Sequence, residues 1–217
     1  MTTATVLAFD TSAAFCAAAL FSQGQMVSRS EAMHKGQADR LIPMLEEMLA
    51  GAGHSWADLG AIAVGTGPGN FTGVRIAVAA ARGIALGLGI PAIGVTRLEA
   101  LAYGAPRPVT VAEDARRGAI YLQRFAAEGA GTARLLDIAR FDALADQVIG
   151  PVTGSAASLL GAIEIPPALP IAEAIARIAA TRLDTPQPRP APFYLRGADA
   201  APPSDPPPVI LPEPALP

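Results

Sequence analysis

The stretch TVLAFDTSAAFCAAALFSQGQMVSRSE, residues 5–31, reads as three consecutive β-strands. Thr5 to Phe9 is a β-rich run that ends at a polar turn, Asp10-Thr11-Ser12. Residues 14–21 and 26–31 are two further runs separated by a glycine-containing turn, which is the pattern of a β-hairpin. The stretch therefore predicts a three-stranded antiparallel meander that starts the fold.

Alternating helix and strand patterns follow this meander. Gln37 to Leu49 has apolar residues at helical spacing, and Thr72 to Leu88 predicts a second helix. Short strands are expected at Leu59 to Val64 and Ala92 to Val95, and a further helical turn or two at Arg97 to Tyr103. Antiparallel strands followed by βα units predict a mixed sheet with helices packed on its faces. This α/β arrangement is typical of a ribonuclease-H-like lobe.

A second pattern starts after Pro106 and Pro108. Two strand-like runs flank the turn Asp114-Ala-Arg-Arg-Gly118 and predict a hairpin, and Ile171 to Leu183 predicts a helix. Prolines crowd the chain from residue 185 onward, which is typical of extended or disordered segments. We therefore expect three parts, namely a lobe over residues 1–105, a second lobe over 106–196 and a proline-rich, disordered tail over 197–217.

Composition narrows the class of protein. The formal net charge of -3 argues against a broad basic surface that binds nucleic acid unaided. The single cysteine, Cys16, excludes an internal disulfide and fits a reducing cytosol. The apolar run at residues 74–93 contains Arg75 and Arg82, which favours a buried helix over a membrane span. We therefore expect a cytoplasmic protein with no membrane segment.

The glycine-rich loop GTGPGNFTGVR, residues 65–75, leads into the second helix. It lacks the G-x-x-x-x-G-K-[ST] pattern of a Walker A loop and the G-x-G-x-x-G pattern of a dinucleotide site. A helix N-terminus still favours an anion, so we expect Thr72 as the N-cap, with Arg75 adding positive charge. Together with the first polar turn, the candidate anion or nucleotide residues are Asp10, Thr11, Ser12, Gly67, Gly69, Asn70 and Thr72.

Other groups of reactive residues are sparse. His34 and His54 are the only histidines, and neither has a second ligand at helical spacing, so no metal site is expected. A Ser-His-Asp arrangement is not legible, and we expect no catalytic residue. Asp114, Arg116 and Arg117 are candidates for contacting an anion at the hairpin tip, although a solvated turn is the commoner use of such residues.

Small residues surround the whole cylinder of the second helix: Gly73, Ala77, Ala80, Ala81, Gly83, Ala85 and Gly87. A glycine inside a helix costs roughly 1 kcal/mol relative to alanine. We therefore expect close backbone approach on more than one side, from the chain's own sheet and from a second helix or a partner. A core helix packed only within its own domain is the alternative.

Five motifs occur in the order found in one family: LAFDTS (7–12), GTGPGNFTGVR (65–75), RGIALGLGIPAIGVTRLEALA (82–102), DARRGAIYLQRF (114–125) and PFYLRGADA (192–200). The chain closely resembles the TsaB (YeaZ) family of the actin-like ATPase group over nearly its whole length up to about Ala200. The resemblance implies two ribonuclease-H-like lobes, the second reduced. It also implies a non-catalytic role in forming N6-threonylcarbamoyladenosine at position 37 of tRNAs that read ANN codons.

The resemblance further implies partners. A metal-containing paralogue, TsaD, transfers the threonylcarbamoyl group, a TsaE ATPase subunit joins the pair, and tRNA is met through the complex. A homodimer through the same helices is also possible. No cofactor is bound tightly, and ATP with Mg²⁺ is no more than possible, in the complex. In the family the first two helices pack against equivalent helices of TsaD. The implied interface residues are Leu41, Met44, Leu45, Met48, Arg75, Ala77, Val78, Ala81, Arg82 and Ala85.

Two other functions compete with this interpretation. A stand-alone phosphotransferase or ATPase of the actin-like group would use Asp10 and the loop at residues 65–69. A metallopeptidase is disfavoured because histidine ligands are missing.

Overall fold

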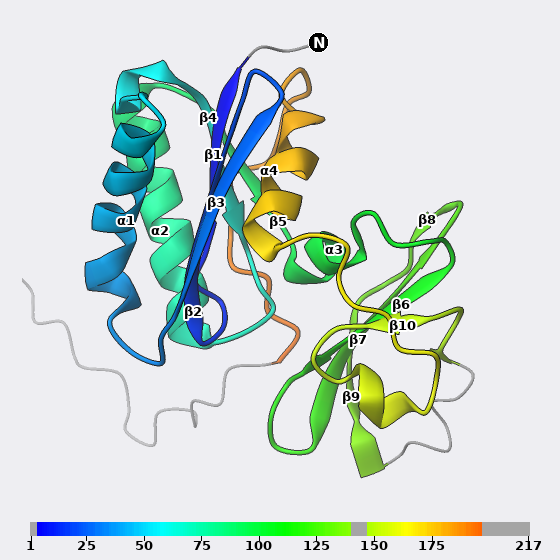
Figure 1. The fold of residues 1–217 in the computed structure, drawn as a ribbon. Coiled ribbons are helices and arrows are strands. Elements are labelled where there is room, and N and C mark those ends of the chain that lie inside the picture. Colours follow the sequence, from blue (N-terminus) through cyan, green and yellow to red (C-terminus); the bar gives the residue numbers. More distant parts are fainter. Residues whose placement is uncertain (1–3, 140–146, 197–217) are drawn as a thin grey trace, which may run out of the picture.

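The computed structural model describes residues 4–139 and 147–196 and divides them into two lobes, each built on its own sheet (Figure 1). The predicted tail at 197–217 lies outside the described residues. The first lobe contains a five-stranded sheet of order β3-β2-β1-β4-β5. Its strands are β1 (Thr5–Asp10), β2 (Phe15–Ser22), β3 (Gln25–Ala32), β4 (Leu59–Gly65) and β5 (Ala92–Val95).

The pairing of these strands confirms the predicted mixed sheet. β1, β2 and β3 pair antiparallel, and β4 and β5 add in parallel to β1. Successive residues of a strand point to opposite faces. Leu7 and Phe9 of β1 accordingly enter one apolar cluster, and Val6 and Ala8 enter another on the opposite face. Both faces of the sheet must therefore be covered.

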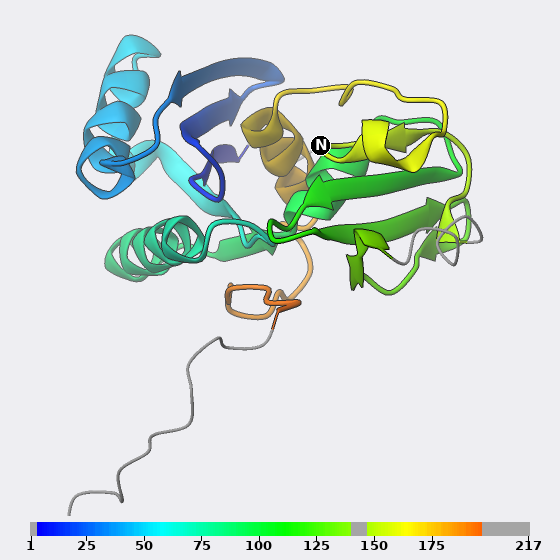
Figure 2. The ribbon, with the colours of Figure 1, turned by 90° about the horizontal axis from the view of Figure 1, so that it is seen from below.

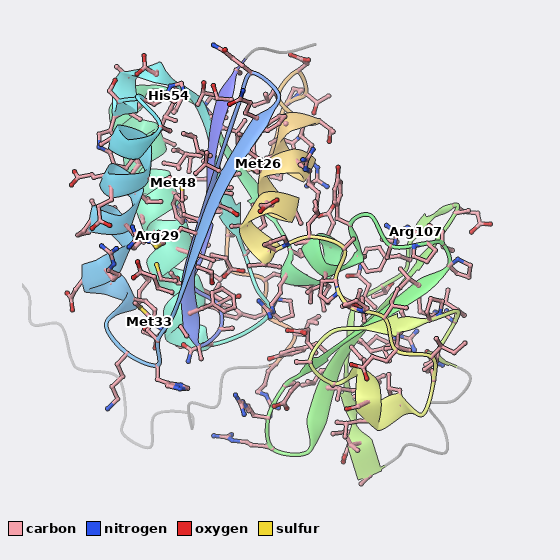
Figure 3. The ribbon with its side chains drawn as sticks, viewed as in Figure 1. Met26, Arg29, Met33, Met48, His54 and Arg107 are labelled. Atoms are coloured by element: carbon pink, nitrogen blue, oxygen red, sulfur yellow. The ribbon has the colours of Figure 1, made fainter. Side chains whose placement is uncertain are left out.

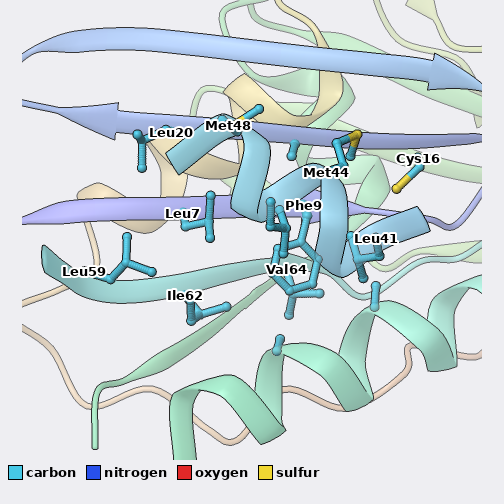
Figure 4. Close-up of a cluster of buried hydrophobic side chains, with 14 of the residues drawn as sticks. Leu7, Phe9, Cys16, Leu20, Leu41, Met44, Met48, Leu59, Ile62 and Val64 are labelled. Atoms are coloured by element: carbon cyan, nitrogen blue, oxygen red, sulfur yellow. The ribbon is translucent and has the colours of Figure 1, made fainter. Parts of the chain in front are cut away.

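Helices cover both faces (Figure 1). On one side α1 (Gln37–Gly51) and α2 (Phe71–Leu88) pack on β2 and β4. Figure 4 shows Leu7, Phe9 and Met44 in the cluster between these helices and the sheet. On the other side α4 (Ile171–Ala180) packs on β1 and β2. A boundary at residue 106 would assign α4 to the second lobe, but it completes the core of the first.

The second lobe is reduced to a small sheet of order β10-β6-β7-β8, with β9 also pairing with β7. The predicted hairpin is present, because β6 and β7 pair antiparallel on either side of residues 115–118. The helix α3 (Arg97–Ala102) joins the lobes and packs on β6. The strands of this lobe are β6 (Val109–Asp114), β7 (Ala119–Ala126), β8 (Gly129–Ala130), β9 (Arg134–Asp137) and β10 (Val152–Thr153). A short 3-10 helix, Ala157–Leu160, follows β10, and another, Trp56–Asp58, precedes β4 in the first lobe.

An ion-pair network ties the edge strand β3 to α1. Arg29, labelled in Figure 3, contacts Glu31 at 2.7 Å and Glu47 at 2.6 Å, and Arg40 contacts the same two carboxylates. Hydrogen bonds from Arg40 and then Arg29 lower the pKa of Glu47 to about 2. The network therefore operates throughout the neutral range.

Acid should remove the contribution of Glu47 to stability. A carboxyl group with a depressed folded pKa stabilises the fold above its unfolded pKa, and loses this contribution as the pH falls through the folded pKa. We expect Glu47→Gln to be less stable than the wild type at pH 7, with a small difference because the pair is exposed. The difference should shrink from about pH 5 downward and vanish only below pH 2. Urea unfolding of both proteins from pH 7 to pH 2 measures it, and a gap at pH 2 as large as that at pH 7 would contradict the assignment.

Candidate functional site

The glycine-rich loop holds the first polar turn against the start of α2. The amide of Asn70 donates to the Ser12 carbonyl at 2.6 Å, and the Thr11 hydroxyl donates to the Gly73 carbonyl at 2.6 Å. An added Cβ would lie 1.9 Å from the Thr11 carbonyl oxygen at Gly73, and 2.3 Å from the Ser12 carbonyl oxygen at Gly69. These two glycines thus permit a close approach of backbone to backbone within the chain.

The N-cap of α2 is Asn70, so the prediction of Thr72 is wrong. The Asn70 side-chain oxygen accepts from the Gly73 amide at 2.9 Å, whereas Thr72 lies exposed in the first turn. The Asn70 and Gly73 amides therefore already donate inside the chain, and an anion at this helix end would have to compete for them. The predicted cap lies two residues too late, because asparagine and threonine are both common caps and no local pattern distinguishes them here.

Substitution of the two residues distinguishes the caps. Asn70→Ala should lower the free energy of unfolding by about 1 kcal/mol, because it leaves an amide of the first turn without its acceptor. Thr72→Ala is the matched control and should change stability far less. Chemical denaturation of both variants measures the difference. Equal losses would contradict the assignment.

A buried ion network lies where the lobes meet. The Arg97 guanidinium donates to the Glu113 carboxylate at 2.5 Å and lies 3.9 Å from Asp10. Asp10 is fully buried at the end of β1, and its other oxygen accepts from the Ser12 amide at 2.5 Å. Burial opposes the charge of Arg97, but the negative charges of Glu113 and Asp10 raise its pKa. A carboxylate from each lobe thus shares one guanidinium.

This network changes what Asp10 can do. A cation bound by Asp10 would be repelled by the positive charge of Arg97, which lies 3.9 Å from that carboxylate. Among the described residues, no three His, Cys, Asp or Glu side chains gather closely enough to hold a metal ion. Sequence reasoning singled out neither Arg97 nor Glu113, because no local pattern joins residues sixteen positions apart across two lobes.

The predicted partner interface requires a correction. All of its residues except Arg75 and Arg82 are buried in the chain's own core: Leu41, Met44, Leu45, Met48, Ala77, Val78, Ala81 and Ala85. The helical period of apolar residues marks the side of α1 and α2 that faces the sheet, not the side that a partner can reach. A surface for a partner must use the outer faces of these helices.

The outer face of α2 combines small and apolar residues. Phe71 is 52% exposed and Leu86 is 80% exposed. Gly83 and Gly87 are also exposed, and a Cβ at either would meet no atom of the described chain within 4 Å. The chain's own packing therefore does not require these glycines. Gly73 permits a close contact with the backbone of Thr11 in the same chain, while Gly83 and Gly87 are accessible to a partner molecule.

Two grooves border this face, between α2 and the segment that follows α4. The larger has a volume of about 950 Å³ and the smaller about 380 Å³. Arg82, Leu86 and Arg189 line both. Arg82 and Arg189 make no hydrogen bond or ion pair with the residues that the structure describes, whereas Arg182 pairs with Glu99. The grooves are thus apolar with unpaired positive charge.

α2 passes a test of length and apolar composition for a membrane span, although a third of it is buried inside the fold. Its buried residues contact the sheet, as the prediction of a buried helix requires. Core helices commonly pass the same test.

Comparisons with known proteins point to one family. A family model described as TsaD, tRNA N6-adenosine threonylcarbamoyltransferase, matches residues 30–201. The chain is 40% identical over 121 residues to the tRNA threonylcarbamoyladenosine biosynthesis protein TsaB of Escherichia coli strain K12, covering 54% of this chain and 52% of that protein. It is 36% identical over 129 residues to the Haemophilus influenzae protein of the same name, covering 57% and 55%. The chain spans about half the length of the curated relatives it matches.

Solved structures agree with the fold. YeaZ from Pseudomonas aeruginosa superposes with a TM-score of 0.70 and 28% identity, covering 88% of this chain and 100% of that chain. A second Pseudomonas aeruginosa structure, described as similar to peptidase YEAZ, gives a TM-score of 0.71 and 28% identity over 89% and 100%. The family model and these whole-chain likenesses lead to one conclusion. The chain belongs to the TsaD-related family of tRNA N6-adenosine threonylcarbamoyltransferases, in its TsaB (YeaZ) branch.

Proposed function

We propose that the chain is a non-catalytic partner subunit of the complex that forms N6-threonylcarbamoyladenosine at position 37 of ANN-decoding tRNAs. It binds and activates a TsaD paralogue through the outer face of α2. The observation that carries the proposal is the pair Gly83 and Gly87, which face solvent and have no intrachain reason to lack a side chain. The names of the curated relatives support the pathway.

The chemistry of this face supports a helix as the partner's contacting element. Glycines four residues apart lie on one side of a helix and let a second helix approach closely. The exposed Leu86 supplies apolar area beside them, and Arg82 offers an unpaired cation. A partner helix with small residues and a carboxylate would match this surface. A second copy of the chain is the competing occupant, and it would give a homodimer through the same face.

The proposal extends to the rest of the complex. A TsaE ATPase subunit joins the pair, tRNA is met by the assembled complex in the cytoplasm, and ATP with Mg²⁺ is held only there. The positive charge of Arg97 beside Asp10 disfavours a Mg²⁺ ion at that carboxylate, which supports the absence of nucleotide chemistry in the chain alone. A stand-alone ATPase is the alternative. Calorimetry of the isolated chain with ATP and Mg²⁺ decides between them, because saturable binding would favour the ATPase.

Reconstitution tests the proposal directly. The TsaD paralogue and TsaE of the same organism are supplied with threonylcarbamoyl-AMP and an unmodified tRNA transcript, with and without this chain. We expect the modified nucleoside, measured by mass spectrometry after digestion, to form only when the chain is present, and the chain to elute with the TsaD paralogue in gel filtration. Separate elution and unchanged modification would refute the proposal.

A further inference from the structure

The tip of the β6–β7 hairpin holds two arginines in an unfavourable backbone conformation. Arg116 has φ 61° and Arg117 has φ 53°, in the left-handed region that L-residues rarely adopt. Glycine would adopt these angles with less strain. The Arg116 side chain is 85% exposed, and its ion pair with Asp114 is 3.4 Å long. Folding of the hairpin therefore gives no reason for a guanidinium at position 116.

The end of the described chain brings a further arginine side chain to this tip. Arg196 donates to the carbonyls of Ala115 and Arg116 at 3.1 and 3.3 Å. Figure 2 shows the segment that ends at residue 196 between α2 and the strands of the second lobe. The tip and the N-terminal end of α2 are thereby joined through this segment, although they belong to different lobes.

Aromatic rings continue the surface toward α2. The rings of Phe71 and Tyr194 lie 5.4 Å apart, and the Arg75 guanidinium lies 3.6 Å from the centre of the Phe71 ring. Arg75 also donates to the Tyr194 hydroxyl at 2.8 Å. Phe71 and Tyr194 remain 52% and 45% exposed despite this stacking. We call the whole surface the arginine–aromatic strip, and its members are Phe71, Arg75, Arg116, Arg117, Tyr194 and Arg196.

We propose that the arginine–aromatic strip is a direct contact for RNA. A guanidinium group can donate two parallel hydrogen bonds to the oxygens of one phosphate, and half-exposed aromatic rings stack on unpaired bases. Arg116 and Arg117 contact the phosphate backbone, and Tyr194 offers its ring to an unstacked base. An acidic protein segment would use the charges but would have no need of the rings. The inference rests on the proposed function, which makes tRNA the substrate of the complex, and adds that this chain touches it.

Glycine substitutions test the charges without straining the fold. Arg116→Gly combined with Arg117→Gly removes both guanidiniums, and glycine adopts the left-handed backbone with less strain, so the turn itself should be kept. Circular dichroism and thermal unfolding of the variant check that the fold is intact. Gln23→Gly is the matched control, because Gln23 has φ 51° at the β2–β3 turn in the other lobe. An unmodified transcript of an ANN-decoding tRNA is titrated with the complex of this chain and its TsaD paralogue, followed by fluorescence anisotropy at several salt concentrations.

The expected result is weaker binding by the double variant and a salt dependence of log K that is shallower by about 1 for each arginine lost. The Gln23→Gly complex should match the wild type. The ring is tested with a single-stranded oligouridine in place of the tRNA. Tyr194→Leu in the same complex should weaken its binding, while Tyr194→Phe, which keeps the ring, should not. Unchanged affinity and salt dependence in the double variant would overturn the proposal. So would a loss of TsaD association with unchanged tRNA affinity, because it would identify a protein contact.

The experiment distinguishes failure of the proposed function from failure of the proposed RNA contact. Association of the chain with the TsaD paralogue is measured first without RNA. If the two do not associate, the proposed function fails, and titration of the chain alone with the same transcript still decides whether the strip binds RNA.

Discussion

Gly83→Leu should weaken association with the TsaD paralogue while the isolated chain becomes more stable. The Cβ of the new side chain points into open space in the isolated chain, where leucine favours a helix over glycine by up to about 1 kcal/mol. In the complex it would occupy the gap through which the partner's helix approaches. Overpacking of this kind costs about 1–3 kcal/mol, or roughly 5- to 150-fold in Kd. Thermal unfolding and calorimetry measure the two effects.

The opposite signs make this experiment informative. A variant that binds poorly because it is misfolded would lose stability, whereas this one should gain it. Gly51→Leu is the matched control, because Gly51 is also a helical glycine whose Cβ would meet no atom of the described chain within 4 Å, and it does not line the grooves. Wild-type affinity in Gly83→Leu would remove the main support for the proposed interface.

Arg97→Met should lower the free energy of unfolding by about 3–5 kcal/mol at neutral pH, because it leaves two buried carboxylates without their shared countercharge. The pKa of Arg97 is raised in the fold, so the stabilisation by Arg97 itself is constant from acid to neutral pH. Urea unfolding of the variant and the wild type at pH 7 measures the loss.

A double substitution separates the network from simple loss of packing. Arg97→Met combined with Glu113→Gln removes one of the two stranded charges and should recover part of the lost stability. Arg134→Met, at an exposed arginine on β9, is the control and should change stability little. An additive effect of the two substitutions would contradict the shared ion network.

Local patterns predicted the elements well. The meander at residues 5–31 follows from short-range features, namely β-rich runs and a glycine-containing turn, and the structure has these strands. The helix at residues 171–180 was equally legible, but its position against the first sheet was not. The alanines of α4 do not indicate which of the two sheets the helix packs on, because this depends on packing between segments more than a hundred residues apart.

The candidate site was harder to predict for a related reason. Apolar residues on α1 and α2 suggested a partner, yet they face the sheet, and the exposed side is marked by the absence of side chains at Gly83 and Gly87. Which glycine of a helix meets the chain's own backbone becomes clear only when the loop at residues 10–12 is placed. Arg97 and Glu113 are likewise ordinary residues until the two lobes bring them together.

The place of α4 also has a consequence for synthesis on the ribosome. One face of the first sheet, lined by alanines of β2 and β4, stays without its cover until residues 171–180 have left the exit tunnel. The nascent chain must therefore carry an apolar sheet surface through the synthesis of the whole second lobe. During that interval the surface is open to chaperones and to neighbouring nascent chains, and the first lobe closes only near the end of translation.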